Sequence, residues 1–279
     1  MIKFSAPGKI HLLGEHSVVY GKPAILAAIN LRITVSITSG ANNLPHYLKP
    51  IENMLKLKHI PSYRVKIDSQ IPIGSGLGSS AAISAAYIAS LLSFLKIKWD
   101  GKLINELAFE AEKIFHGNPS GGDNTTVVYG GLIWFEKGKL FIPLPSKIKN
   151  FFLIDSGRPL ESTKEMIEIA KPKIKSILDD QERLVKELAV ALKDGNEEKL
   201  IEIIRNGERN LEKIGVVGRK AQKIIREVEK TGGAAKILGG GGFKDGSGMI
   251  LCYHGNLKGQ PRLNRGQKIT IGEEGLRQE

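Results

Sequence analysis

The 279-residue sequence predicts an α+β protein with a strand-rich N-terminal half and a helix-rich C-terminal half. Two observations lead to this fold class. Apolar and polar residues alternate from Ile33 to Ile37, which is the period of a strand. After about residue 150 the pattern changes, and leucines recur every four residues from Leu184 to Leu192, as on one face of a helix. We therefore expect two domains, residues 1–150 and 151–279.

The N-terminal half is expected to begin with strands joined by a glycine-rich loop, within residues 1–40. A small-residue loop, Gly74 to Ser80, then precedes an apolar helix, and Gly117 suits the C-terminal cap of the helix that follows. Lys137-Gly138 between two apolar runs indicates a hairpin. The remaining expected elements are a loop with a short helix at 51–57, a strand from about 65 that ends at Pro72, and helices at 81–95 and 101–115.

The C-terminal half is expected to open with a strand at 151–155 and continue as charged, amphipathic helices with a turn at 194–196. A run of four glycines, 239–242, and a strand at 248–253 follow. The single cysteine, Cys252, falls in that strand, where we expect it to be buried. The polar tail, about 256–279, is expected to be poorly ordered.

Composition is that of a globular protein, with 41% hydrophobic and 25% charged residues, but the formal net charge is +12. Such an excess suits nucleic acid, an anionic membrane surface or small anions. One cysteine excludes an intramolecular disulfide and a cysteine-rich metal site. The longest apolar stretch, residues 81–95, is interrupted by serines and too short to span a membrane. With no signal-peptide pattern at the N-terminus, we expect a cytoplasmic protein.

The strongest local motif is the loop that includes Pro72, Gly74, Gly76, Leu77, Gly78, Ser79 and Ser80. Glycines allow the backbone to approach a ligand, and the following helix directs unpaired N–H groups and its positive end at one place. These features favour a phosphate-binding loop. The motif lacks the Lys-Ser/Thr ending of a Walker A loop and the third glycine of the dinucleotide fingerprint. The alternative is a strand–turn–helix corner with Ser79 as an ordinary cap.

Two carboxylates could form a second site. Glu112 lies in the last turn of its predicted helix, and glycines and a proline between residues 117 and 122 can turn the chain so that Asp123 returns near that helix end. Two carboxylates there could hold Mg²⁺ and accept a proton. The alternative is a solvated helix-end glutamate and a turn aspartate.

A third segment runs from Lys9 to His16 and contains His11 and Glu15. Its histidine and glutamate spacing does not match the zinc-protease patterns. Each of these charged residues, taken singly, could equally be a surface residue. The glycine run 239–242 suits close approach to a ligand, with a flexible hinge as the alternative. Basic residues of the C-terminal helices alternate with acids and lack aromatic neighbours, which argues against a nucleic-acid surface.

Taken together, these segments resemble the GHMP kinase superfamily, and most closely its archaeal-type mevalonate kinases. The resemblance covers about residues 6–250. Its motifs occur in the order expected for that family: Ala6-Pro7-Gly8-Lys9 with Gly14-Glu15-His16-Ser17-Val18-Val19-Tyr20-Gly21, then Pro72 to Ala82, then His116 to Asn124, then Lys236 to Gly242.

The resemblance implies a two-domain GHMP kinase-like fold and an ATP-dependent transfer to the 5-hydroxyl of mevalonate. It implies that Asp123 is the base and that Lys9 stabilises it, and that the loop from Pro72 to Ser80 binds ATP. It assigns Mg²⁺ to Ser80 and Glu112. Mevalonate would contact Glu15, His16, Ser162 and Thr163. A homodimer is one option for its assembly, and neither nucleic acid nor a membrane is expected as a partner.

The sequence departs from the family pattern at two places. Leu238 stands where the third glycine motif, Lys236 to Gly242, usually has a threonine, and Leu160-Glu161 stands where relatives often have an arginine. Alternatives are therefore another GHMP kinase, such as a phosphomevalonate or homoserine kinase, a decarboxylase of the same superfamily and, more distantly, a basic nucleic-acid-binding protein.

Overall fold

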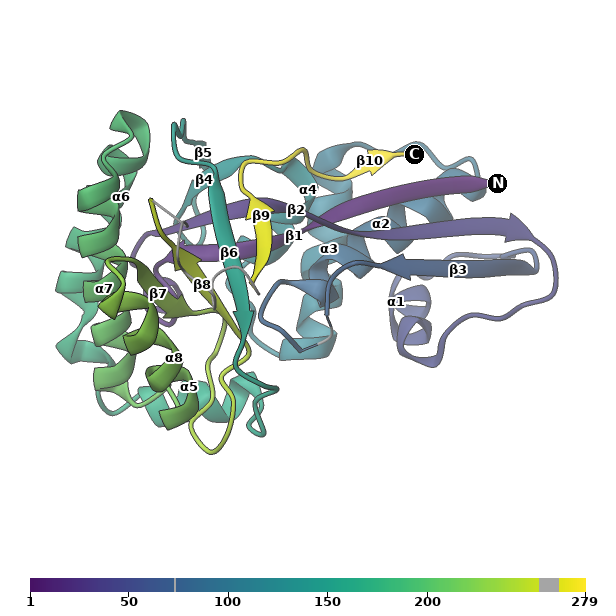
Figure 1. Ribbon diagram of the computed structural model, residues 1–279. Coiled ribbons are helices and arrows are strands. Elements are labelled where there is room, and N and C mark those ends of the chain that lie inside the picture. Colours follow the sequence, from purple (N-terminus) through teal and green to yellow (C-terminus); the bar gives the residue numbers. More distant parts are fainter. Residues whose placement is uncertain (73, 256–265) are drawn as a thin grey trace.

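The computed structural model describes residues 1–72, 74–255 and 266–279. Its strands form two antiparallel sheets, each accompanied by helices (Figure 1). The expected α+β fold class is confirmed. Among the described residues, no helix has both the length and the apolar character needed to cross a membrane.

The larger sheet is built on two long strands, β1 (Ile2–Leu13) and β2 (Ala24–Ser39). Its order is β10-β1-β2-β4-β5, and β3 (Tyr63–Ser69) also pairs with β2. The shorter strands are β4 (Leu132–Phe135), β5 (Ile142–Pro143) and β10 (Arg277–Gln278). Almost every residue of β1 is buried, which places its polar side chains inside the molecule.

Helices from the same half of the chain cover this sheet. They are α1 (Lys49–Met54), α2 (Ser79–Phe94), α3 (Gly101–His116) and α4 (Gly122–Tyr129). The apolar helix α2 contacts β1, β2, α3 and α4, so it forms the centre of the main core. Asp100 caps the start of α3 by accepting the Leu103 N–H at 2.8 Å, and Gly117 forms its C-terminal cap, as predicted.

The smaller sheet has the order β7-β8-β6-β9. Its strands are β6 (Asn150–Asp155), β7 (Ala234–Ile237), β8 (Met249–Tyr253) and β9 (Gln267–Thr270). The helices of this half are α5 (Thr163–Ala170), α6 (Leu178–Asp194), α7 (Glu197–Ile214) and α8 (Arg219–Lys230), on the left of Figure 1. Cys252 is fully buried in β8, as expected.

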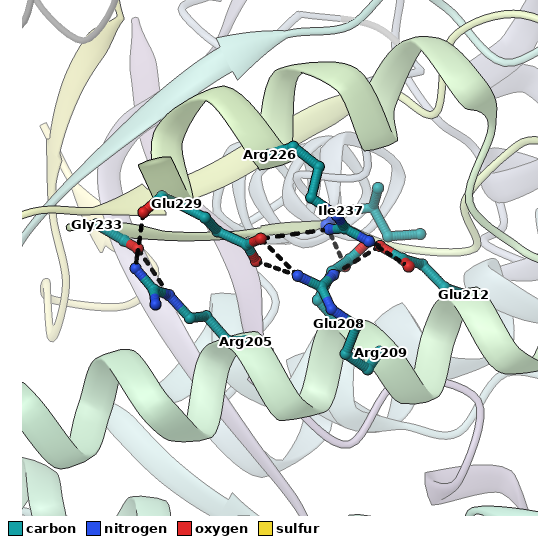
Figure 2. A network of polar contacts seen from close by, with 8 residues as sticks. All are labelled: Arg205, Glu208, Arg209, Glu212, Arg226, Glu229, Gly233 and Ile237. Atoms are coloured by element: carbon teal, nitrogen blue, oxygen red, sulfur yellow. Dashed lines mark hydrogen bonds and ion pairs between the residues drawn. The ribbon is translucent and has the colours of Figure 1, made fainter. Parts of the chain in front are cut away.

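A network of ion pairs joins α7 to α8 (Figure 2). Arg209 binds Glu229, and Arg226 binds Glu212 at 2.6 Å. These partners neutralise arginines that contribute to the positive net charge. Helix α7 also holds both ends of β7, because Arg205 donates to the Gly233 carbonyl at 2.9 Å and Glu208 accepts the Ile237 N–H at 3.0 Å. The network therefore fixes the strand that leads into the four-glycine run.

The end of the chain returns to both sheets. β9 pairs with β6, and β10 pairs with β1, so the C-terminus lies beside the N-terminal strand (Figure 1). The expectation of a poorly ordered tail over 256–279 is wrong for residues 267–270 and 277–278, which form these two strands; residues 256–265 lie outside the described part. The division into domains at residue 150 stays a prediction.

Candidate active site

A cleft of about 760 Å³ lies between the two halves of the molecule. Its walls come from β1, the loop before α2, the end of α3, the start of α4, the segment before α5 and the glycine run after β7. Segments that are far apart in the sequence therefore meet here. The predicted site residues that line it are Lys9, Glu15, His16, Gly74, Gly76, Gly78, Ser79, Ser80, Glu112, Asp123 and Ser162.

The glycine-rich loop connects β3 to α2 and leads directly into the helix. Gly78 precedes the first helical residue with a φ of 72°, in the left-handed region. A Cβ atom at Gly78 would lie 2.6 Å from Lys9 Cγ, and one at Gly76 would lie 2.8 Å from the Leu238 carbonyl oxygen. Side chains would therefore close the space between this loop, β1 and the third glycine motif. The start of α2 leaves backbone N–H groups available to an anion.

Lys9 and Asp123 form an ion pair within the cleft. Lys9 Nζ lies 3.1 Å from Asp123 Oδ2, and the lysine is 3% exposed. β1 supplies Lys9, and the first turn of α4 supplies Asp123. Burial acts to raise the pKa of Asp123, but the Lys9 ammonium and the hydrogen bond with His11 outweigh it and hold the pKa below its usual range. The aspartate is thus kept ionised, as a proton acceptor must be.

Glu112, on α3, lies close to Asp123 and is 1% exposed. Burial, together with the charge of Asp123, raises the pKa of Glu112 to about 8, although the Ser80 hydroxyl and Lys9 oppose the shift. Glu112 Oε1 is buried and has no hydrogen-bond partner in the described part of the chain. Ser80 Oγ lies 3.1 Å from His116 Nε2, and that nitrogen lies 3.7 Å from Glu112 Oε2.

The oxygen atoms of Ser80 and Glu112 are ligands that fit a magnesium ion. A buried carboxylate oxygen without a partner costs free energy unless a cation or donor reaches it. Mg²⁺ commonly takes one or two protein oxygens and completes its shell with phosphate and water. Within the described ranges, no group of three or more His, Cys, Asp or Glu side chains is arranged to hold a metal ion.

Glu15 and His16 form another part of the cleft wall. Glu15 is 3% exposed and pairs with Lys236 of β7, which is completely buried. Lys236 Nζ also donates to the Ile237 carbonyl at 2.8 Å. His16 Nε2 lies 3.1 Å from the Gly240 carbonyl oxygen, and burial lowers the pKa of His16. The first motif and the third glycine motif are thus held against each other by side chains.

The segment before α5 also lines the cleft. Ser162 caps α5 in a reciprocal capping box with Glu165, so its hydroxyl is engaged in that cap. Thr163 begins α5, and its side chain lies outside the described part. The adjacent Glu161 is buried and accepts the Lys244 N–H at 3.0 Å.

Two of the predicted loop residues do not line the cleft in the structure. Pro72 is exposed beside the loop. Leu77 is 1% exposed and packs in the core, and its carbonyl accepts the Lys9 N–H at 2.9 Å. Both therefore shape the loop, and neither side chain faces the cleft.

Several lining residues were not predicted as site residues. His11 is two positions after Lys9 on a strand, and this spacing places both on one face. His116 is four positions after Glu112 on a helix, which also brings the two together. These spacings were signals in the sequence that could have identified them. Further lining residues are Arg158, Glu161 and Lys164.

The arrangement combines an anion cradle, a buried lysine and an ionised carboxylate in one cleft. Such a set can position a phosphoryl group, neutralise its charge and remove a proton from an attacking hydroxyl.

Comparison with known proteins agrees with this chemistry. Residues 46–131 match the family "GHMP kinases N terminal domain". The chain is 35% identical to a mevalonate kinase of Archaeoglobus fulgidus over 92% of each chain. In fold, it is similar to Methanococcus jannaschii mevalonate kinase, with a TM-score of 0.82 at 21% identity over 97% of this chain and 98% of that one. It is also similar to L. major mevalonate kinase in complex with R-mevalonate, with a TM-score of 0.79 at 22% identity over 98% and 96%. The chain therefore belongs to the GHMP kinase superfamily and, within it, to the mevalonate kinase family, a family of phosphotransferases with an alcohol acceptor.

Proposed function

We propose that this protein transfers the γ-phosphoryl group of ATP to the primary 5-hydroxyl of mevalonate. The observation that carries the proposal is the ion pair between the buried Lys9 and Asp123, which faces the same cleft as the glycine-rich loop. The loop would hold the nucleotide phosphates while the carboxylate receives the hydroxyl of the acceptor.

In this proposal Asp123 accepts the proton of the attacking hydroxyl. Lys9 stabilises both the ionised aspartate and the negative charge that develops on the alkoxide oxygen. Backbone N–H groups from Gly76 to Ser80 bind the β- and γ-phosphates at the positive end of α2. Because phosphoryl transfer depends chiefly on alignment and charge neutralisation, these groups account for the main protein contributions.

Ser80 and Glu112 would hold Mg²⁺, since the Ser80 hydroxyl and the unpartnered Oε1 of Glu112 line the same part of the cleft. The ion would supply neutralisation of charge on the β- and γ-phosphates. Glu112 must lose its proton to act as a ligand, so metal binding would oppose the raised pKa of its carboxyl.

Mevalonate would occupy the part of the cleft beside Glu15 and His16, with Ser162 and Thr163 at its edge. Arg158 and Lys164 also line the cleft, and such cations suit the carboxylate of mevalonate. One of the similar solved structures, that of L. major mevalonate kinase, is described as a complex with R-mevalonate. The buried Leu238, in place of the usual threonine, contributes its backbone to the contact with the phosphate loop.

An acceptor panel tests the proposal. ADP formation would be measured with ATP and Mg²⁺ and one acceptor at a time: mevalonate, phosphomevalonate, homoserine or galactose. We expect mevalonate to give the highest kcat/KM and activity to disappear when Mg²⁺ is chelated. A higher kcat/KM with phosphomevalonate or another acceptor would contradict the proposal. Release of CO₂ from diphosphomevalonate would indicate the decarboxylase alternative instead.

A nucleic-acid function has less support, because Arg209 of α7 and Arg226 of α8 are engaged in ion pairs with glutamates. The absence of nucleic-acid binding, a cytoplasmic location and a homodimer remain predictions. Gel shift at physiological salt and sedimentation of the purified protein would test the first and the last.

A further inference from the structure

A second side chain of β1 contacts the proposed base. His11 Nε2 lies 3.4 Å from Asp123 Oδ1, while Lys9 Nζ lies 3.1 Å from the other oxygen, Oδ2. Lys9 and His11 are two residues apart on one strand, so their side chains emerge on the same face. The Asp123 carboxylate is therefore held at both of its oxygens by a single strand.

The orientation of the His11 ring leaves little choice of tautomer. His11 is 6% exposed, and its Nδ1 is buried without a hydrogen-bond partner among the described residues. An ionised carboxylate accepts hydrogen bonds only, so Nε2 must carry the proton that it donates to Asp123. In the neutral ring with its proton on Nε2, Nδ1 carries a lone pair.

This contact limits how the carboxylate can rotate. Each carboxylate oxygen can accept two hydrogen bonds, and one site on each is taken by Lys9 or His11. The side chain of Asp123 is 30% exposed, so the remaining sites can face the cleft. A carboxylate bound at one oxygen only could turn away from an incoming hydroxyl.

We propose that His11 is a positioning residue for Asp123: by donating from Nε2, it fixes the rotation of the carboxylate and stabilises its charge. His11 acts through Asp123 and does not itself exchange a proton with the acceptor. This inference rests on the proposed function, because it assigns a role to His11 in the same reaction.

The charged and titratable groups around the pair determine the expected pH effect. Asp123 faces Lys9 and His11 on β1, and Glu112 and His116 on α3. His11 also lies near His16, and its carbonyl accepts a hydrogen bond from Lys236 at 3.3 Å. Burial raises the pKa of Asp123, whereas Lys9 and His11 lower it. Loss of the His11 donor must therefore raise the pKa of Asp123 and shift the acid limb of activity to higher pH.

Two amide variants distinguish the effect of the hydrogen-bond donor from the effect of the size of the ring. In His11→Gln the amide nitrogen can reach about as far as Nε2, whereas in His11→Asn it ends near the position of Nδ1. We expect His11→Asn to lower kcat about tenfold, the effect of losing one hydrogen bond to a charged group. KM for ATP should stay constant, and the acid limb of kcat/KM against pH should move upward. His11→Gln should stay within about threefold of wild type.

Equal kcat and equal acid limbs in wild type and His11→Asn would overturn the inference, and so would equal impairment of both amide variants. If His11→Asn does not fold, His11→Leu serves as the variant without a donor. The tautomer can also be read by ¹⁵N NMR of the wild-type protein, without any turnover. A proton on Nε2 supports the inference, and an Nε2 without a proton overturns it. If the wild-type protein does not phosphorylate mevalonate, only the proposed function is refuted. The activities of wild type and the His11 variants would then be compared on the acceptor that the protein does use.

Discussion

The buried ion pair between Lys236 and Glu15 makes a strong prediction about stability. Lys236 is completely buried in β7, and Glu15, which follows the end of β1, is 3% exposed. Methionine in place of Lys236 has a side chain of similar length but carries no charge. It leaves the Glu15 carboxylate buried without its cation, and it removes the donors to the His11 and Ile237 carbonyls.

The magnitude follows from this burial. Removing one member of a buried ion pair costs about 3–5 kcal/mol, because the remaining charge has lost its compensation. At about 2–4 °C per kcal/mol for a chain of this size, Lys236→Met should lower Tm by roughly 6–20 °C. Adding Glu15→Gln to Lys236→Met removes the orphaned charge, so the double variant should recover about 2 kcal/mol or more.

Urea unfolding of wild type, both single variants and the double variant, at neutral pH and constant salt, completes the thermodynamic cycle. Arg226→Ala is the matched control, because Arg226 is partly exposed and neither it nor its partner Glu212 lines the cleft. It should cost no more than about 1 kcal/mol. A loss below about 1 kcal/mol for Lys236→Met, or strictly additive losses in the double variant, would refute the reasoning.

Three further predictions concern single side chains. Asp123→Asn should lower kcat by about 10²–10⁴-fold with little change in KM for ATP, measured by coupled ADP detection; a decrease below tenfold would argue against Asp123 as the base. Burial raises the pKa of Glu208 from 4.5 to about 8, so the folded state holds a proton that the unfolded state has released. Stability should therefore fall as pH rises from about 4.5 to 8, and Glu208→Gln should flatten that fall in urea unfolding across this range; an unchanged slope would contradict it. Burial also raises the pKa of the Cys252 thiol, so a thiol reagent should react with it only after denaturation, and fast labelling of the folded protein would show that β8 is accessible.

Local signals in the sequence predicted much of the fold. The apolar run after the glycine-rich loop became α2, which starts at Ser79, and Gly117 ends α3. The leucine repeat from Leu184 to Leu192 lies buried on α6. In these elements the periodicity of apolar residues and the cap residues agree with each other, so no distant contact is needed to decide the structure.

Other elements depend on contacts that local patterns do not contain. α4 begins at Gly122, a residue that disfavours helices, and the helix is formed in contact with α2, α3 and β1. β10 is exposed at both of its residues and pairs with β1 through the backbone, so it lacks the apolar alternation that would reveal a strand.

The same distinction applies to the candidate site. Lys9 and Asp123 were predicted as a functional pair through the motifs around them, and the structure places their charged atoms 3.1 Å apart. The pairing of Glu15 with Lys236 joins residues 221 positions apart, and spacing along the chain does not reveal such contacts. His11 was visible in the first motif, but its role depends on how closely α4 approaches β1.

The central claim is that the cleft places the 5-hydroxyl of mevalonate between Asp123 and the phosphate loop. A crystal structure with mevalonate and a non-hydrolysable ATP analogue tests it most directly. We expect the 5-hydroxyl oxygen within hydrogen-bond distance of the Asp123 carboxylate, and the terminal phosphate against the backbone of Gly76 to Ser80. Mevalonate bound with its carboxylate toward Asp123, or a nucleotide whose phosphates lie away from that loop, would contradict the account.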